Sequence, residues 1–208
     1  MHPEALSDRG KKLFPRLKNF SEFYLAGGTA LALQLGHRRS VDFDFFSPKP
    51  IERNLLAKIK KIFVFSEITA AIDNPDELTV FVDSVKITFL KYPFPILTKL
   101  IKFKGIKILS AKEIGIAKAY AIGRRGSYKD YVDLYFILKK KIASLAETIN
   151  LAAKKYGFDF NSRLFLEQLL YLEDVKDLKI FFLGQKQLSK EEVKSFFKKE
   201  TEKFRIKG

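Results

Sequence analysis

The segment Val41–Phe46 constrains the fold most, because it alternates acidic and aromatic residues at a spacing of two. Side chains alternate between the two faces of a β-strand, so Asp42 and Asp44 are expected on one face and Phe43 and Phe45 on the other. The phenylalanines can anchor the strand in a hydrophobic core. The segment therefore predicts a strand in a sheet that has one buried face.

The two aspartates of this segment would repel each other in a partly buried position unless a cation neutralised them. Carboxylate oxygens in a small cluster suit Mg²⁺ or Mn²⁺ that also bridges to phosphates. The alternative is an exposed edge strand, where acids on the solvent face need no metal. The motif alone leaves both interpretations open.

A glycine pair precedes the acidic strand at short range. The apolar run Phe23–Leu25 predicts a strand, Gly27-Gly28 a tight turn, and Thr29–Leu35 a helix that Gly36 ends. Glycines let backbone N–H groups approach a phosphate, and a helix N-terminus favours negative charge. The surrounding residues match neither a Walker P-loop nor a dinucleotide-binding turn. A phosphate-binding glycine turn followed by an Asp-x-Asp strand is instead the arrangement of two-metal nucleotidyl transfer.

The remaining pattern predicts an α/β (α+β) protein with two regions, residues 1–105 and residues 106–208. In the first region the expected helices are Glu4–Leu17, interrupted or ended near Pro15, and Glu52–Phe63. The further expected strands are Val64–Ile72, Leu78–Val82 and Val85–Lys91, with Asp83-Ser84 as the turn into the last of them. The second region is expected to be mostly helical and to pack on the first. Its helix start signals are Ser110 with Glu113, Ser127, Ser144 with Glu147, and Ser189 with Glu192.

The chain carries 39 Lys and Arg residues against 24 Asp and Glu, a formal net charge of +15. Such a surplus favours a polyanionic partner, although many lysines can simply solvate the surface. Cysteine is absent and His2 and His37 are the only imidazoles, which excludes disulfides and argues against a zinc site. No signal peptide and no apolar run of about 20 residues is visible, so we expect a cytoplasmic protein without a membrane segment.

Two blocks of the sequence resemble the AbiEii/AbiGii nucleotidyltransferase family of the polymerase-β-like nucleotidyltransferase superfamily. The first block comprises Tyr24–Leu31 and His37–Phe46, which contain the glycine pair and the Asp-x-Asp strand. The second, Lys118–Leu134, is similar to the family's downstream pattern of Lys, then Arg-Gly, then a basic residue before Asp-x-x-Asp-Leu. Together they cover about residues 20 to 140, and the joint match is far more specific than either block. The resemblance implies a nucleotidyltransferase-like mixed β-sheet with helices, followed by a helical half.

The same resemblance implies a toxin of an AbiE-like, type IV toxin–antitoxin system. Such a toxin transfers a nucleoside monophosphate from a nucleoside triphosphate to an acceptor and releases pyrophosphate, with Mg²⁺ or Mn²⁺ as cofactor. In some relatives the acceptor is the end of tRNA, so tRNA is the expected acceptor here. A cognate antitoxin is the implied protein partner.

Site residues follow from the resemblance by position. Asp42 and Asp44 are the implied metal ligands, and with Lys118 and Asp133 they form the implied catalytic set. The implied nucleotide-binding residues are Gly27, Gly28, Thr29, His37, Arg38, Ser40, Arg125, Lys129 and Asp130.

Spacing and residue type bear on several of these implied roles. Lys118 and Arg125 lie about two helical turns apart, so one helix face can present both to a triphosphate. Lys129 replaces the commoner Arg of the family and keeps the charge but not the fork-shaped donor group. Asp130 falls in the first turn of a predicted helix, where the helix dipole by itself favours a carboxylate. Ordinary loop hydrogen bonds would equally explain the histidine and arginine of the His37-Arg38 pair.

The chain departs from the superfamily at one position. A third carboxylate usually follows on a later strand, and within Val85–Leu90 it is Thr88 that stands where this acid is expected. Threonine is neither a general base at neutral pH nor a charged metal ligand, so Asp133 and Asp83 are the candidates to substitute. Two alternatives stay open: a catalytically degenerate module that binds nucleotide or RNA, and a nucleotidyltransferase acting on a protein or small-molecule hydroxyl.

Overall fold

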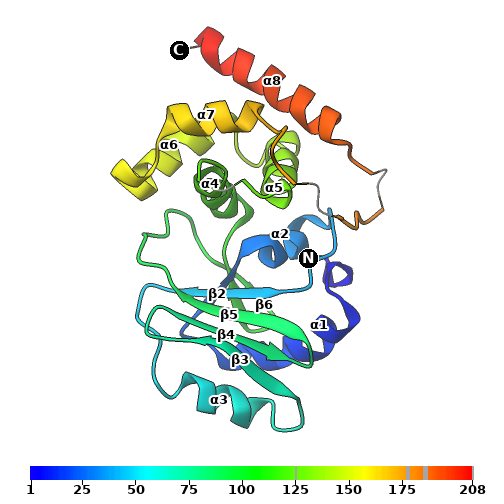
Figure 1. Ribbon diagram of the computed structural model, residues 1–208, viewed down its shortest axis with the longest axis vertical. Coiled ribbons are helices and arrows are strands. Elements are labelled where there is room, and N and C mark those ends of the chain that lie inside the picture. Colours follow the sequence, from blue (N-terminus) through cyan, green and yellow to red (C-terminus); the bar gives the residue numbers. More distant parts are fainter. Residues whose placement is uncertain (125, 177–178, 185–186, 208) are drawn as a thin grey trace. The chain divides into compact units, whose positions relative to one another are not determined.

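The computed structural model describes residues 1–124, 126–176, 179–184 and 187–207 (Figure 1). The chain divides into two compact units. The first comprises Met1–Pro95 and Lys99–Ser110, and the second comprises Ile96–Thr98 and Ala111–Gly208.

The first unit is built on a seven-stranded mixed sheet in the order β3-β4-β5-β2-β1-β7-β6. The strands β2 and β5 run parallel, as do β1 and β7, and the other neighbours are antiparallel. The strands are β1 (Tyr24–Ala26), β2 (Phe43–Ser47), β3 (Ile68–Asp73), β4 (Glu77–Val82), β5 (Val85–Lys91), β6 (Ile101–Phe103) and β7 (Ile106–Ile108). The strand that carries Asp44 is therefore central in the sheet, between β5 and β1.

Helices lie on both faces of this sheet, with α2 (Gly27–Leu35) on one face and α3 (Leu55–Ile62) on the other (Figure 1). The face opposite α2 holds a cluster of phenylalanines. Phe45 and Phe89 stack with ring centroids 5.5 Å apart, and Phe20 lies 4.9 Å from Phe89. Phe43 and Phe45 are fully buried, which confirms their predicted role as anchors of the acidic strand. Aromatic burial on one face thus directs the alternate residue, Asp44, to the α2 face.

Several predicted boundaries were wrong. The opening helix Glu4–Leu17 is instead three short pieces, η1 (Pro3–Ala5), α1 (Asp8–Leu13) and the 3₁₀ segment η2 (Phe14–Asn19). The predicted interruption near Pro15 is confirmed, since proline cannot donate the backbone hydrogen bond of a continuing α-helix, whereas the earlier break between η1 and α1 was not predicted. The prediction also missed the hairpin β6–β7, whose turn at Lys104-Gly105 has positive φ angles of 49° and 83°.

The second unit consists of helices, as predicted. They are α4 (Ala111–Ile122), α5 (Tyr128–Lys139), α6 (Leu145–Tyr156), the 3₁₀ turn η3 (Gly157–Asp159), α7 (Ser162–Leu170) and α8 (Lys190–Lys207). The predicted start signals at Ser127, Ser144 and Ser189 are confirmed: the Ser144 and Ser189 hydroxyls each accept a backbone N–H from the third residue of the helix, and Ser127 starts α5 with a capping box. The helix α7 was not predicted.

Glu113 explains why the short segment Ile96–Thr98 belongs to the second unit. One carboxylate oxygen accepts the backbone N–H groups of Leu97 and Thr98, at 3.1 and 3.0 Å. The other pairs with Lys155 Nζ at 2.7 Å, and both side chains of this ion pair are buried. An ion pair removed from water needs such additional hydrogen bonds to be tolerated.

Together the mixed sheet and the helical second unit confirm the predicted α/β class. No helix in the described part of the chain combines the length and the apolar character that crossing a membrane requires.

Candidate active site

The Asp44 carboxylate lies beside the first turn of α2. In the antiparallel register of β1 and β2, Asp44 is the partner of Ala26, the residue directly before that helix. Asp42 was predicted to lie on the same strand as Asp44. The strand instead begins at Phe43, so Asp42 directly precedes it. The pleat of the strand therefore orients Asp44 but not Asp42, and the expectation that one strand holds both acids was wrong.

The backbone angle of Gly27 and the nearby Asp44 carboxylate both restrict which residue can occupy position 27. Its φ angle is +64°, in the left-handed region that favours glycine, and a Cβ atom there would lie 2.5 Å from Asp44 Oδ2. Both constraints exclude any other residue without local rearrangement. The predicted proximity of the glycine turn to the acidic strand is thus present for Gly27 and Asp44.

The helix α2 begins at Gly27 itself, two residues earlier than predicted, so Gly27 and Gly28 are its first two residues. The N-cap residue is Ala26, whose side chain makes no capping hydrogen bond. The first N–H groups of a helix have no partner within the helix, and with the helix dipole they favour an anion. This helix end therefore has the properties of a phosphate site next to a carboxylate.

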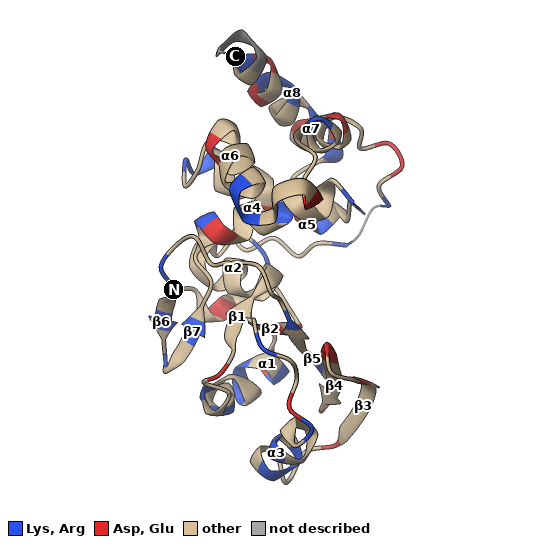
Figure 2. Ribbon diagram, turned by 90° about the vertical axis from the view of Figure 1, so that its left-hand side faces the viewer, with Lys and Arg blue, Asp and Glu red and all other residues tan. Residues whose placement is uncertain are grey.

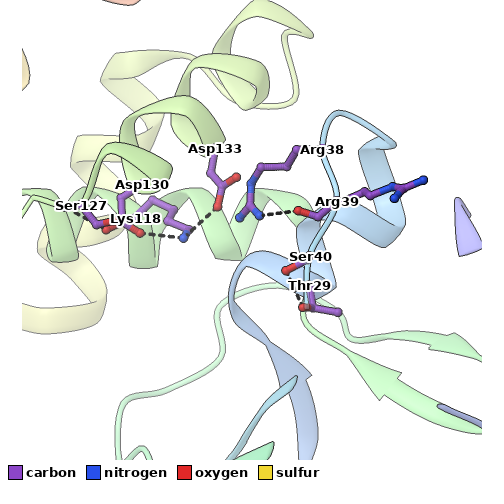
Figure 3. A network of polar contacts seen from close by, with 8 residues as sticks. All are labelled: Thr29, Arg38, Arg39, Ser40, Lys118, Ser127, Asp130 and Asp133. Atoms are coloured by element: carbon purple, nitrogen blue, oxygen red, sulfur yellow. Dashed lines mark hydrogen bonds and ion pairs between the residues drawn. The ribbon is translucent and has the colours of Figure 1, made fainter. Parts of the chain in front are cut away.

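Thr29 holds the loop before β2 in place (Figure 3). Its hydroxyl donates to the backbone carbonyl of Asp42 and shares a 2.7 Å hydrogen bond with the Ser40 hydroxyl. The Ser40 backbone N–H in turn donates to the carbonyl of Ala5 at 2.8 Å. Because these contacts occupy both hydroxyls, the structure gives Thr29 and Ser40 a part in positioning Asp42.

His37 and Arg38 were predicted to contact the nucleotide or to stabilise the loop. Both side chains are buried, and the Arg38 guanidinium donates to the carbonyl of Arg39 at 3.1 Å (Figure 3). The contact to Arg39 is a local loop hydrogen bond of the kind that the plainer interpretation expected.

Thr88 is the neighbour of Asp44 across the parallel β2–β5 pair. Its hydroxyl lies 3.1 Å from the Thr79 hydroxyl on β4, and Thr79 donates to Glu77 Oε1 at 2.7 Å. A polar row thus crosses three strands from Asp44 to Glu77. Asp83, one predicted substitute for the missing acid, instead lies in the β4–β5 turn and accepts the Glu67 backbone N–H.

The sequence interpretation missed Thr79 and Glu77. Their signal was the alternation Glu77-Leu78-Thr79-Val80, in which Leu78 and Val80 are fully buried and the polar residues share the other face.

The second unit contains a compact charged cluster on α4 and α5. Lys118 Nζ lies 2.7 Å from Asp130 Oδ1 and 2.9 Å from Asp133 Oδ2 (Figure 3). All three side chains are largely buried, with 11%, 11% and 0% of their surface exposed. The other oxygen of Asp130 accepts the Ser127 backbone N–H and completes a capping box. Asp130 is therefore explained structurally by two contacts, whereas Asp133 is oriented toward Lys118 without a capping role.

Two further predicted residues belong to this unit. Lys129 is half-buried in the first turn of α5. Arg125 lies outside the described residues, and α4 ends at Ile122, so the expectation that Arg125 shares a helix face with Lys118 concerns a residue that the structure does not describe.

Asp42 and Asp44 fit a magnesium ion in ligand chemistry. No group of three or more His, Cys, Asp or Glu side chains among the described residues could hold a metal ion. Magnesium, however, is usually bound through one or two carboxylates together with water and substrate phosphates. The Asp44 carboxylate beside the start of α2 is one such ligand, and Asp42, whose backbone carbonyl accepts the Thr29 hydroxyl, carries the second carboxylate.

Comparison with known proteins agrees with these features. The family model of the nucleotidyl transferase AbiEii toxin, of type IV toxin–antitoxin systems, matches residues 12–205. An uncharacterized protein of Aquifex aeolicus is 35% identical over 194 residues, which is 88% of this chain and 88% of that protein.

Two solved structures share the fold. A nucleotidyltransferase from H. pylori is 22% identical, with a TM-score of 0.58 over 97% of this chain and 99% of that chain. The nucleotidyltransferase toxin MenT4 from Mycobacterium tuberculosis is 16% identical, with a TM-score of 0.63 over 90% of this chain and 78% of that chain. The family match spans both the acidic strand and the helical unit, and it confirms the resemblance seen in the sequence. The chain belongs to the AbiEii nucleotidyl transferase toxin family of type IV toxin–antitoxin systems.

Proposed function

We propose that this protein transfers a nucleoside monophosphate from a nucleoside triphosphate to a hydroxyl of RNA, with tRNA as the acceptor. The observation that carries the proposal is the Asp44 carboxylate seated against Gly27 at the start of α2. The acid proposed to bind the cation and the helix end proposed to bind phosphate therefore lie side by side. Family membership supports the reaction class.

In this proposal Asp42 and Asp44 hold Mg²⁺ or Mn²⁺, and the backbone N–H groups of Gly27 and Gly28 bind phosphate. The bound cation would supply charge neutralisation at the triphosphate and would acidify the attacking hydroxyl. Thr29 and Ser40 position the Asp42 backbone through their hydroxyl contacts.

The cationic side chains are proposed to neutralise the triphosphate. Lys118 would supply a point charge, and Asp133, buried and paired with it, would orient its ammonium group. His37, Arg38, Arg125 and Lys129 complete the proposed nucleotide-binding residues, while Asp130 fixes the start of α5.

The proposed reaction is an in-line displacement at the α-phosphorus. A bond forms from the acceptor oxygen to this phosphorus, the bond to the β-phosphate oxygen breaks, and pyrophosphate leaves. The hydroxyl proton is released to water. Positioning and charge stabilisation are the enzyme's main contributions to such a phosphoryl-type transfer.

The surplus of positive charge supports RNA as the acceptor. Several of the exposed lysines of the first unit lie on α1, α3 and the β6–β7 hairpin (Figure 2), among them Lys11, Lys12, Lys60, Lys61, Lys102, Lys104 and Lys107. Phosphate contacts by Lys and Arg supply most of non-specific nucleic-acid affinity. A protein hydroxyl or a small-molecule acceptor would gain little binding affinity from this positive charge. We propose that the protein acts in the cytoplasm, where both nucleotides and tRNA are present.

The test is label transfer by the purified protein. Each of the four α-labelled nucleoside triphosphates is incubated with Mg²⁺ and total tRNA, and pyrophosphate release is measured in parallel. We expect transfer with at least one nucleotide. Absence of labelled RNA and of pyrophosphate with all four nucleotides would refute the proposal.

Asp44→Asn is the decisive variant, because it keeps the shape but removes the charge that binds the cation. We expect transfer to fall by at least about a hundredfold. The matched control is Asp73→Asn on the exposed end of β3, which should retain full activity. Equal activity of both variants would mean that the reaction takes place at another site.

The second candidate is a module that binds nucleotide or RNA without turnover. It is favoured by Thr88, which stands beside Asp44 where the superfamily usually places an acid. This candidate predicts saturable, salt-sensitive RNA binding with no covalent product. Detection of any nucleotide joined to RNA would exclude it.

We further propose that the protein acts as a toxin whose activity a cognate antitoxin counters, as membership of a type IV toxin–antitoxin family implies. Induced expression should arrest growth, and Asp44→Asn should relieve the arrest at equal protein level. Arrest by the Asp44→Asn variant would separate toxicity from nucleotidyl transfer.

A further inference from the structure

The polar row beside Asp44 has a defined hydrogen-bond direction. A carboxylate only accepts hydrogen bonds, so the Thr79 hydroxyl must use its single proton on Glu77 Oε1. Thr79 can then only accept in its 3.1 Å contact with Thr88, which makes Thr88 the donor there. The proton of Thr88 is thereby directed away from β2.

The oxygen of Thr88 is left with lone pairs on the face that Asp44 occupies. Phe45 and Phe89, the residues after Asp44 and Thr88, stack on the opposite face, so Asp44 and Thr88 share the α2 face. Neighbouring strands lie about 4.8 Å apart, which places the two side chains next to each other. Within the described residues, the Thr88 hydroxyl makes its hydrogen bond with Thr79.

Burial protects this order. Thr79 and Thr88 are only 5% and 9% exposed, so water competes little for their hydroxyls. In such surroundings the hydrogen bonds in a chain polarise one another, and a charged acceptor at one end makes the terminal oxygen a better electron donor. Glu77, at the half-buried start of β4, is that charged end.

We propose that Thr88 Oγ1 serves as a neutral oxygen ligand for the divalent cation held by Asp42 and Asp44. In this role it takes the place of the third carboxylate, and Thr79 and Glu77 are positioning residues that direct its lone pairs. The inference rests on the proposed function and assigns the row a task within that site. A neutral ligand lowers the negative charge of the site by one compared with a third acid, so the cation binds more weakly.

The test measures Mn²⁺ binding to the purified full chain by electron paramagnetic resonance, alongside nucleotidyl transfer. Thr88→Val removes the oxygen at nearly constant shape, and we expect it to weaken Mn²⁺ binding about tenfold. Thr88→Ser keeps the hydroxyl and should bind Mn²⁺ as the wild type does. Thr88→Asp should bind Mn²⁺ about tenfold more tightly than the wild type, since it adds a charge.

The positioning role is tested by Glu77→Gln, because an amide can donate as well as accept and no longer forces the direction of the row. We expect the Mn²⁺ affinity to fall by about threefold or more, while the melting temperature stays nearly unchanged. The matched control is Thr69→Val, on the exposed strand β3. It should leave binding and transfer unchanged.

Two outcomes would overturn the inference. Equal Mn²⁺ affinity of Thr88→Val and Thr69→Val would exclude Thr88 as a ligand, and an unchanged affinity in Glu77→Gln would exclude the positioning role. If Thr88→Val does not fold, Thr88→Asp and Glu77→Gln still decide the question, because both are expected to change the Mn²⁺ affinity. Equal Mn²⁺ binding by the wild type and Asp44→Asn would instead refute the proposed function itself.

Discussion

At the scale of single residues, position 27 has the least freedom in the proposed site. The backbone there adopts a conformation that L side chains rarely accept, and the space for a Cβ is taken by a carboxylate oxygen. The two constraints act on different quantities. The backbone angle affects folding stability, whereas the collision affects the place of Asp44.

Gly27→Ala should therefore cost about 1–2 kcal/mol of unfolding free energy and shift the Asp44 carboxylate. A displacement of this kind near reacting groups lowers the transfer rate by about a hundredfold. Gly184→Ala is the matched control, since Gly184 has a φ of +63° but nothing within 4 Å of its added Cβ. It should cost stability alone, measured by urea unfolding, and leave transfer unchanged. Equal transfer rates in the two variants would show that a Cβ at position 27 does not displace the Asp44 carboxylate.

Tyr131 gives a prediction about pH. Burial, and secondly the charge of Asp130, raise the pKa of this phenol to about 12, and its hydroxyl donates to the Gln168 carbonyl at 3.0 Å. A pKa raised above the unfolded value means stability that is full below about pH 10 and is lost as pH rises from 10 to 12. The loss is at most about 3 kcal/mol, because one decade of proton affinity is worth about 1.4 kcal/mol.

The measurement is urea unfolding between pH 9 and pH 12, comparing the wild type with Tyr131→Phe. The variant lacks the ionisable hydroxyl, so its unfolding free energy should fall less steeply across this range. Parallel curves would show that the Tyr131 phenol does not ionise differently in the folded state.

At the scale of secondary-structure elements, α4 and α5 are joined by one lysine and two aspartates. Lys118→Met keeps the length of the side chain but leaves Asp130 and Asp133 without their shared cation. Removing one partner of a buried pair costs about 3–5 kcal/mol. We expect that loss in thermal or urea unfolding.

Lys112→Met, on the same helix, is the control. Its pair with Glu147 is solvated, with 38% and 42% of the side chains exposed, and such surface pairs contribute less than about 1 kcal/mol. Adding Asp133→Asn to Lys118→Met should recover part of the stability, because one stranded charge disappears. A cost for Lys118→Met no larger than that for Lys112→Met would mean that the cluster stays hydrated.

At the scale of the whole molecule, the net charge of +15 sets how RNA binding responds to salt. If about six phosphates are contacted, affinity for tRNA should fall about a thousandfold between 50 and 200 mM salt. Fluorescence anisotropy with labelled tRNA measures this, and Asp44→Asn should show the same salt slope as the wild type. A salt-independent affinity would argue against RNA as the partner.

Local patterns in the sequence anticipated much of the structure. The Phe–Asp alternation, the glycine pair, the capping serines and the Asp83-Ser84 turn each depend on residues a few positions apart, and each is present at or near its expected place. The errors fell on boundaries and on short elements: the additional break between η1 and α1, the two three-residue strands β6 and β7, and α7. Three-residue strands carry too few alternations to give a pattern.

What the sequence by itself determined is the direction in which each side chain leaves its own segment, because the periods of strand and helix are local properties of the backbone. Only the tertiary structure decided which segments became neighbours. The partnership of Asp44 with Thr88, the link from Thr88 through Thr79 to Glu77, and the sharing of Lys118 by two aspartates depend on register between strands and helices. That register is set by how whole hydrophobic faces pack, and no short stretch of sequence contains it.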